Sequence, residues 1–317
     1  MASEIIAEIK KGRNFLITSH VRVDGDALGS ELALYLMLKE SGKNVVVYNQ
    51  DDTPENYRFL PAPACIVHEL GDVSRFDAAF ILDCSDLERV GDEAQKIGYV
   101  KTLINIDHHV SNGRFCDLTI LDAEASSTGE LIYGLMREMS YALTKDICTN
   151  LYTAILTDTG GFRYSNTRAA ALQAAGDLVA SGADPQWISE NIYESDPPQK
   201  IKLLAKALET LNLDMAQKIS SMVVTQKAMQ ETGASYDHTE GFVDVIRSVN
   251  GMEVAVLYSQ LQENYFKLSL RSKGKVNVEK VAKLFGGGGH FNAAACRIEG
   301  DIEDIKARVA RAITESV

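Results

Sequence analysis

The sequence has no run of apolar residues that approaches the ~20 needed to cross a membrane. It also lacks the apolar block of a signal peptide, because its start includes Glu4, Glu8, Lys10 and Lys11. These absences argue against a membrane-spanning or secreted protein. We therefore expect a soluble, cytoplasmic protein with no membrane partner.

Cysteine is scarce and scattered. The five cysteines, Cys65, Cys84, Cys116, Cys148 and Cys296, are odd in number and include no CxxC pair. This pattern argues against a disulfide framework and against a zinc finger. We expect reduced thiols that serve as small core residues.

Positive charge is also in deficit. Lysine and arginine total 32 against 44 aspartates and glutamates, which gives a net charge of −12. A protein that tracks long nucleic acid needs a basic face that releases counterions, so a long duplex is an unsuitable partner. A small phosphorylated substrate is still compatible, because carboxylates that hold divalent ions are locally neutralised.

What the sequence does contain is a series of strands that end in acidic or histidine residues. Its 317 residues, 45% of them hydrophobic, suffice for about two domains. Strand-like runs cover 14–19, 44–48, 65–68, 77–82 and 101–106, and helices are expected over 3–12, 27–40, 126–139, 145–157, 167–181 and 185–193. This alternation predicts an α/β domain with a doubly wound parallel sheet, which binds ligands at the carboxyl ends of its strands.

Six candidate ligands stand at these strand and helix ends: His20, Asp24, Asp26, Asp83, His108 and Asp158. Imidazole and carboxylate groups are ligands that divalent metals select. Gly25 lies between two of the aspartates and lets the backbone fold both carboxylates toward one point. Taken alone, Asp107-His108-His109 fits equally well a polar loop whose histidines cap a neighbouring helix.

The ligand types predict a particular metal centre. Six nitrogen and oxygen ligands without sulfur favour Mn²⁺, or Mg²⁺, over structural zinc. They are too many for one catalytic ion that must keep positions open for water, but they suit two divalent ions if one carboxylate bridges them. Two ions about 3.5–4 Å apart activate a shared water and stabilise both oxygens of a phosphoryl displacement. A coincidental set of loop acids is the alternative.

The composition changes at Glu194-Ser195-Asp196-Pro197-Pro198, which predicts a domain boundary. We expect a catalytic metal-binding domain over 1–193 and a linker helix within 194–215. A smaller α+β substrate-binding domain would follow over 216–317, across a cleft from the first. Its sheet would be mixed or antiparallel, with a hairpin formed by 253–260 and 265–271.

The run Gly286-Gly287-Gly288-Gly289-His290 is the main candidate site of the second domain. Ordering four glycines costs considerable chain entropy, so a simple turn explains them poorly. Glycines let backbone N–H groups approach an anion closely, and His290 would add a side-chain donor. Arg271 is a further candidate phosphate ligand, although a solvated position fits it equally well.

Together these motifs resemble those of the DHH phosphoesterase family. The matching residues are, in order, His20-x-x-x-Asp24-x-Asp26, Asp83, Asp107-His108-His109 and Asp158-Thr159-Gly160. The run Gly286-Gly287-Gly288-Gly289-His290-x-x-Ala293-Ala294 resembles the family's associated substrate-binding domain. Relatives often have glycine after the two alanines, whereas Ala295 and Cys296 follow here.

The resemblance implies a role for each matching residue. One ion would be held by His20, Asp24 and Asp83, and the other by Asp26, Asp83, His108 and Asp158, with Asp83 as the bridge. The catalytic residues would be Asp83, His108 and His109, and the substrate-binding residues would be His109, Arg271, Gly287, Gly288, Gly289 and His290. Asp107 would orient the imidazoles, with the capping of a helix as the alternative.

Within the family, chains of this length and layout are similar to the NrnA-type oligoribonucleases, which also dephosphorylate 3′-phosphoadenosine 5′-phosphate (pAp). The resemblance implies Mn-dependent hydrolysis of short oligonucleotides (nanoRNA) from an end, and of pAp, by a two-metal-activated water. A phosphodiesterase of linear or cyclic dinucleotides (c-di-AMP, pApA or pGpG) is the main alternative. The glycine run argues against a pyrophosphatase, and the complete ligand set argues against a noncatalytic nucleotide-binding module. A homodimer is compatible with these features.

Overall fold

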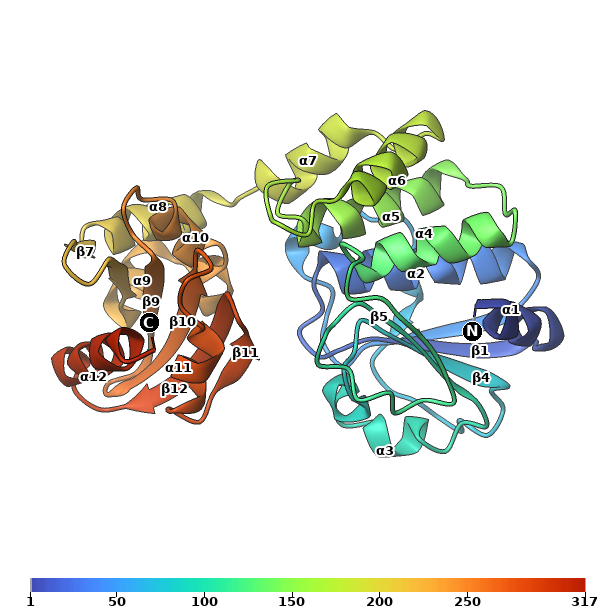
Figure 1. The fold of residues 1–317 in the computed structure, drawn as a ribbon, viewed down its shortest axis with the longest axis horizontal. Coiled ribbons are helices and arrows are strands. Elements are labelled where there is room, and N and C mark those ends of the chain that lie inside the picture. Colours follow the sequence, from blue (N-terminus) through green and yellow to red (C-terminus); the bar gives the residue numbers. More distant parts are fainter. Residues whose placement is uncertain (1, 317) are drawn as a thin grey trace. The chain divides into compact units, whose positions relative to one another are not determined.

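A computed structural model describes residues 2–316 of the chain, apart from the side chain of His290. The chain forms two compact units, residues 1–195 and 196–317 (Figure 1). Among the described residues, no helix is long and apolar enough to cross a membrane.

The first unit is built on a six-stranded parallel sheet. Its strands are β1 (Asn14–Thr18), β2 (Asn44–Tyr48), β3 (Ile66–Val67), β4 (Ala78–Leu82), β5 (Leu103–Asp107) and β6 (Leu118–Leu121). Their order is β3-β2-β1-β4-β5-β6, and every neighbouring pair is parallel, which confirms the expected doubly wound sheet. The order reverses between β1 and β4, so the loops that follow these two strands lie where such folds bind ligands.

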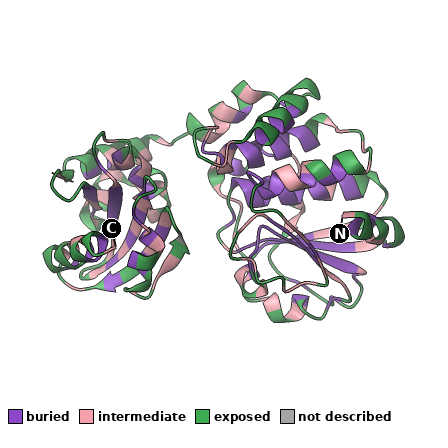
Figure 2. Ribbon diagram, in the orientation of Figure 1, coloured by how far each residue is buried: buried purple, intermediate pink, exposed green. Residues whose placement is uncertain are grey.

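Helices cover the sheet mainly on one face. They are α1 (Ala2–Lys11), α2 (Gly25–Glu40), α3 (Ala94–Ile97), α4 (Thr128–Glu138), α5 (Lys145–Asp158), α6 (Ala169–Ala180) and α7 (Pro185–Tyr193), with short 3₁₀ turns at Glu55–Tyr57, Pro63–Cys65 and Leu87–Val90. Strand β1 sends Phe15 and Ile17 into the core beneath α1, α2, α4 and α5, and Leu16 into a smaller core beneath α3. Figure 2 shows the strands and α2 as the most buried part of this unit.

Close packing of α5 against α2 and α4 depends on glycine. A Cβ added at Gly29 would lie 2.4 Å from a backbone oxygen of α5, and one added at Gly129 would lie 2.4 Å from the Cβ of Ala154. About one helical turn away from these contacts, α2 carries Asp26 and α5 ends at Asp158. The glycines therefore bring these two carboxylates near each other.

The second unit contains a mixed six-stranded sheet. Its strands are β7 (Asn212–Asp214), β8 (Ile219–Val224), β9 (Val254–Gln262), β10 (Tyr265–Ser272), β11 (Gly288–His290) and β12 (Ala293–Glu299). Its helices are α8 (Pro198–Leu208), α9 (Gln226–Thr232), α10 (Phe242–Arg247), α11 (Val278–Lys283) and α12 (Ile302–Thr314), with a 3₁₀ turn at Tyr236–Thr239. The strand order is β11-β12-β10-β9-β8-β7, and β8 and β9 are parallel whereas the other pairs are antiparallel. Helix α8 packs with this unit through Leu203 and Ala207.

The glycine run continues into the edge strand β11, which pairs with β12. A Cβ at Gly287 would lie 2.2 Å from the carbonyl oxygen of Ala295, and one at Gly289 would lie 2.4 Å from that of Ala293. A Cβ at Gly288 would meet nothing within 4 Å. Close strand pairing thus requires two of the glycines, and Gly288 leaves an open position on the sheet.

We expect Gly29→Ala to lower the free energy of unfolding by about 1–3 kcal/mol, because its Cβ would overlap a backbone oxygen of α5. The matched control is Gly134→Ala in α4, where a Cβ meets nothing within 4 Å; it should raise that free energy by about 0.4–1 kcal/mol. Urea unfolding followed by circular dichroism measures both values. Equal effects of the two substitutions would contradict the close-packing account.

Candidate active site

His20 and Asp24 lie at the start of α2, in the loop that follows β1. Asp24 is the N-cap of the helix, and its Oδ1 accepts hydrogen bonds from the backbone N–H groups of Asp26 (3.1 Å) and Ala27 (3.0 Å). Its Oδ2 lies 3.9 Å from Nε2 of His20. The Nδ1 atom of His20 lies 2.9 Å from the carbonyl oxygen of Val21, which fixes the ring with Nε2 facing the carboxylates.

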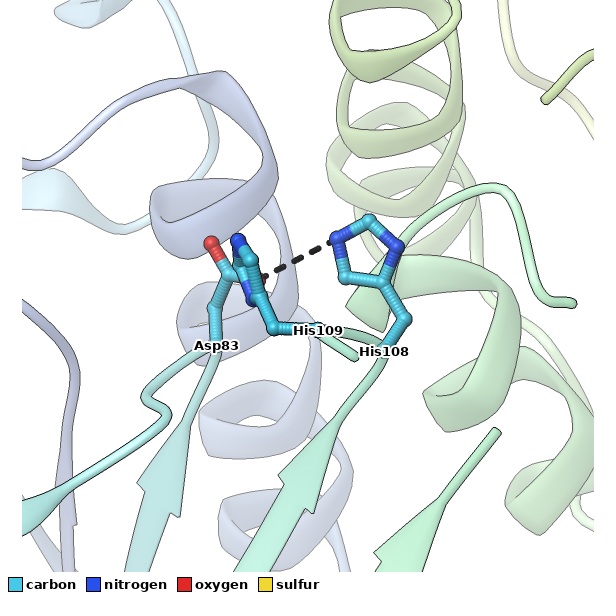
Figure 3. Close-up of side chains that lie close together, drawn as sticks. All are labelled: Asp83, His108 and His109. Atoms are coloured by element: carbon cyan, nitrogen blue, oxygen red, sulfur yellow. Dashed lines mark ion pairs between the residues drawn. The ribbon is translucent and has the colours of Figure 1, made fainter. Parts of the chain in front are cut away.

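Asp83 contacts more of the cluster than any other carboxylate described here. It follows β4 directly, is buried, and has a φ of +56°, an uncommon conformation for a residue with a side chain. Its Oδ2 lies 3.3 Å from Nε2 of His20, and its Oδ1 lies 3.5 Å from both Nε2 of His108 and Nδ1 of His109. Figure 3 shows the Asp83 carboxylate beside the two imidazoles, at the ends of β4 and β5.

Asp26 and Asp158 approach the same ring nitrogen of His108 as Asp83 does. The Nε2 atom of His108 is 3.7 Å from Oδ2 of Asp26 and 3.8 Å from Oδ2 of Asp158. The carboxylate of Asp26 accepts hydrogen bonds from the backbone N–H groups of Thr128 (2.7 Å) and Gly129 (2.9 Å), at the N-terminus of α4. A helix N-terminus favours a negative charge, so α4 helps to hold this carboxylate.

The ligand atoms of these side chains form three overlapping groups, each within 4.8 Å. The groups are His20 with Asp24 and Asp83; Asp26 with His108 and Asp158; and Asp83 with His108 and His109. The structure therefore brings together all six residues that the sequence analysis selected as metal ligands. Asp83 and His108 each belong to two of the groups, so the groups are connected through these two residues.

Asp107 is buried at the end of β5. Its Oδ1 accepts hydrogen bonds from the backbone N–H groups of His108 (2.8 Å) and His109 (3.2 Å), and lies 2.7 Å from Nδ1 of His109. Its Oδ2 accepts a hydrogen bond of 2.6 Å from Nδ2 of Asn112. Asp107 therefore fixes the turn after β5 and the imidazole of His109.

Three supporting side chains were not selected from the sequence: Asn112, Thr128 and Asn166. The hydroxyl of Thr128 donates to Oδ1 of Asp83 at 3.0 Å, so this residue holds carboxylates from both sides of the cluster. Asn166 Nδ2 lies 3.2 Å from Oδ2 of Asp158. The only sequence signal for Thr128 was its place near a helix start, and Asn112 and Asn166 lie in loops where asparagine is common.

Burial and like charge oppose ionisation of two carboxylates. Burial, and then the charges of Asp83 and Asp158, raise the pKa of Asp26 well above its usual value. Burial raises the pKa of Asp158 to about 7, although the charge of His108 opposes the rise. Ionised carboxylates at these positions therefore need a cation beside them.

The opposite shifts occur on the other side of the cluster. Burial alone would lower the pKa of His20, but its hydrogen bond to Asp83 and the charge of Asp24 outweigh burial and raise that pKa to about 9. Burial would raise the pKa of Asp83, but His20, His109 and His108 hold it well below its usual value. Asp83 is therefore ionised at neutral pH.

The other expected substrate-binding residues lie in the second unit. Arg271 stands on β10 opposite Ala293, and the backbone of His290 stands opposite Ala293 on the other side. The Nε atom of Arg271 lies 3.9 Å from Oδ1 of Asp244. Arg271 and the glycine strand thus share one end of this sheet, while the side chain of His290 lies outside the described residues.

The parallel sheet has carboxylates and imidazoles clustered at its carboxyl edge, where such folds bind ligands. Together with the family and the relatives that the chain matches, they identify an enzyme of the phosphoester hydrolase class. The chain belongs to the DHH family. The model of the DHH family's N-terminal domain matches residues 14–155, and that of the DHHA1 domain matches residues 218–315. The two matches fall in the first and the second unit, respectively.

Curated relatives and a solved structure are similar over nearly the whole chain. The bifunctional oligoribonuclease and PAP phosphatase NrnA of Thermus thermophilus is 33% identical, over 99% of this chain and 94% of the relative. The protein of the same name from Bacillus subtilis is 26% identical, over 94% of this chain and 93% of the relative. An exopolyphosphatase-related protein from Bacteroides fragilis has a TM-score of 0.95 and 27% identity, and the match covers 99% of this chain and 95% of the other.

The raised pKa of Asp158 predicts a pH-dependent stability of the metal-free protein. Asp158 keeps its proton in the folded chain up to a pKa of about 7, whereas an unfolded chain loses it near 3.8. The folded state binds more protons between these values, so its free energy of unfolding should fall as the pH rises through this window.

Asp158→Asn should remove the part of the pH-dependent fall in the free energy of unfolding that comes from Asp158. Asp146→Asn, an exposed change in the first turn of the same helix, should retain it. Urea unfolding in the presence of a chelator, at several pH values across the window, measures the slope for each protein. Identical slopes for the two variants would show that Asp158 does not titrate in this way.

Proposed function

We propose that the protein is a Mn²⁺-dependent phosphoesterase that hydrolyses short oligonucleotides from an end and removes the 3′-phosphate of pAp. The similar proteins from T. thermophilus and B. subtilis carry the name of bifunctional oligoribonuclease and PAP phosphatase. The observation that carries the proposal is the convergence of six aspartates and histidines on one small volume at the carboxyl edge of the sheet.

The chemistry of this cluster fits divalent cations. Asp26 and Asp83 are buried, and Asp26 faces the charges of Asp83 and Asp158. Two divalent ions would neutralise the four aspartates of the cluster, Asp24 included, and so remove the cost of bringing these charges together. Oxygen and imidazole ligands without sulfur suit Mn²⁺, while Mg²⁺ is the second candidate because carboxylates also bind it.

Different residues of the cluster would have different roles in the reaction. His20, Asp24 and Asp83 would hold one ion, and Asp26, Asp83, His108 and Asp158 the other. Ions bound there would supply an activated water as the nucleophile and would stabilise charge on the phosphate oxygens. Burial would lower the pKa of His109, but its hydrogen bond to Asp107 outweighs burial and raises that pKa. The protonated ring would then donate to Asp107 from Nδ1 and to the phosphate from Nε2.

The second unit would hold the end of the substrate that is not cleaved. Gly288 leaves an open position beside the backbone of β11, and Arg271 lies at the same end of the sheet. A guanidinium group and backbone N–H groups are suitable ligands for a phosphate in the part of the substrate that is not cleaved. His290 follows the glycines directly and would add a further donor.

Asp83→Ala should lower turnover by at least about a thousandfold on every substrate, because it would remove the ligand that we propose both ions share. Asp92→Ala is the matched control, since Asp92 is an exposed aspartate of the same unit. Steady-state hydrolysis, with bound Mn²⁺ counted by mass spectrometry and the fold checked by circular dichroism, gives the comparison. Near-normal turnover of a folded Asp83→Ala variant would refute the shared-ligand arrangement.

A substrate panel tests the proposed function itself. The wild-type protein should hydrolyse a dinucleotide, a five-nucleotide RNA and pAp with Mn²⁺, and should lose these activities with a chelator. Pyrophosphate and a cyclic dinucleotide should be poorer substrates. Preference for the cyclic dinucleotide would indicate turnover of a signalling nucleotide instead, and no metal-dependent activity on any substrate would contradict an enzymatic function.

A further inference from the structure

The second sheet presents one row with two cations and another row with Arg271, separated by a row of small residues. The pairing of β10, β12 and β11 places Lys267 opposite Arg297 in one row. The next row contains Ser269, Ala295 and Gly288, and the third contains Arg271, Ala293 and His290. By the rise of a strand, the first and third rows are about 13 Å apart. Figure 1 shows these three strands in the second unit.

These rows lie on the side of the strands that faces away from the main core of the unit. Along β10, Lys267, Ser269 and Arg271 are half-buried and alternate with buried residues that pack in that core. Arg297 on β12 is exposed, while its neighbours Cys296 and Ile298 are buried in the same core. The middle row offers almost no side-chain bulk, and its residues are half-buried beside the smaller core that α8 and α10 form with β9.

The first row is electrostatically unfavourable on its own. Lys267 and Arg297 face each other directly across an antiparallel pair, and like charges in this position destabilise a sheet. Among the described residues, no carboxylate lies within 4.0 Å of either cation. The ammonium group of Lys267 instead lies 5.1 Å from the ring centre of Tyr236. An anion between the two cations would relieve the repulsion.

The two units differ sharply in charge. Residues 196–317 contain 16 lysines and arginines against 15 aspartates and glutamates, whereas residues 1–195 contain 16 against 29. A polyanion that extends beyond the cleaved bond is therefore repelled less by the second unit than by the first. Within the second unit, the three rows combine cations with small side chains, which suits a single strand of nucleic acid.

We propose that Lys267 and Arg297 bind a phosphate further along the oligonucleotide than the phosphate held near Arg271 and the glycine strand. The proposal rests on the proposed function and adds a second phosphate site to it. The row of Ser269, Ala295 and Gly288 accommodates the stretch of roughly two nucleotides that spans the distance between the two phosphates. Short substrates that lack this additional phosphate, such as pAp and a 5′-phosphorylated dinucleotide, do not reach Lys267 and Arg297.

The test compares a Lys267→Gln/Arg297→Gln double variant with the wild-type protein. The matched control is Lys306→Gln/Arg308→Gln, which removes the same two charges from α12. For the double variant, kcat/KM on a five-nucleotide RNA should fall about tenfold or more, whereas kcat/KM on pAp and the dinucleotide should not change. The control variant should resemble the wild type on all three substrates.

The salt dependence provides a second readout. For the five-nucleotide RNA, the slope of log affinity against log salt should be smaller in the double variant by about 0.7, the value for one phosphate contact on a single strand. Fluorescence anisotropy of the labelled RNA, measured with chelator to prevent cleavage, gives this slope. An equal loss on pAp and on RNA, or an unchanged slope, would overturn the second phosphate site.

The binding assay also separates this proposal from the proposed function. If the wild-type protein binds the RNA through Lys267 and Arg297 but cleaves none of the substrates, the proposed function fails and the phosphate site stands. If the wild type cleaves all three substrates and the double variant matches it in cleavage and binding, the phosphate site fails and the proposed function stands.

Discussion

Mutual repulsion among Asp24, Asp26, Asp83 and Asp158 is the constraint that the rest of the first unit has to satisfy. The strand order brings the loops after β1 and β4 together, and glycines let α2 and α4 approach α5, so the fold itself gathers these charges. Histidine rings, a helix N-terminus and supporting hydroxyl and amide groups offset part of the repulsion. Divalent cations would offset the remainder, which links the stability of the site to its chemistry.

This arrangement would give the two units different roles. The acidic first unit suits metal ions and a single phosphate, but it is a poor surface for a long polyanion. The nearly neutral second unit carries the glycine strand, Arg271 and the pair of Lys267 and Arg297 on one sheet. The protein would recognise a short substrate from one end if the second unit holds phosphates that the first unit does not cleave.

Much of the site could be predicted because each ligand directly follows a strand or bounds a helix. Strands that end in Asp83 or Asp107 are visible as apolar runs that stop at an acid, and the parallel sheet then brings their ends together. Strand β6 was missed because it is short and only partly buried, and β11 was missed because glycine is unfavourable in strands. Thr128 could not be identified because its role depends on where α4 packs, which local sequence does not encode.

The central claim is that the cluster holds two divalent ions that share Asp83. Electron paramagnetic resonance of the wild-type protein titrated with Mn²⁺ tests it most directly, because two ions joined by one carboxylate are magnetically coupled. The account predicts two Mn²⁺ ions per chain with a coupled spectrum, which reverts to that of uncoupled ions in Asp83→Ala. A wild-type protein that binds a single ion, or two ions without coupling, would contradict it.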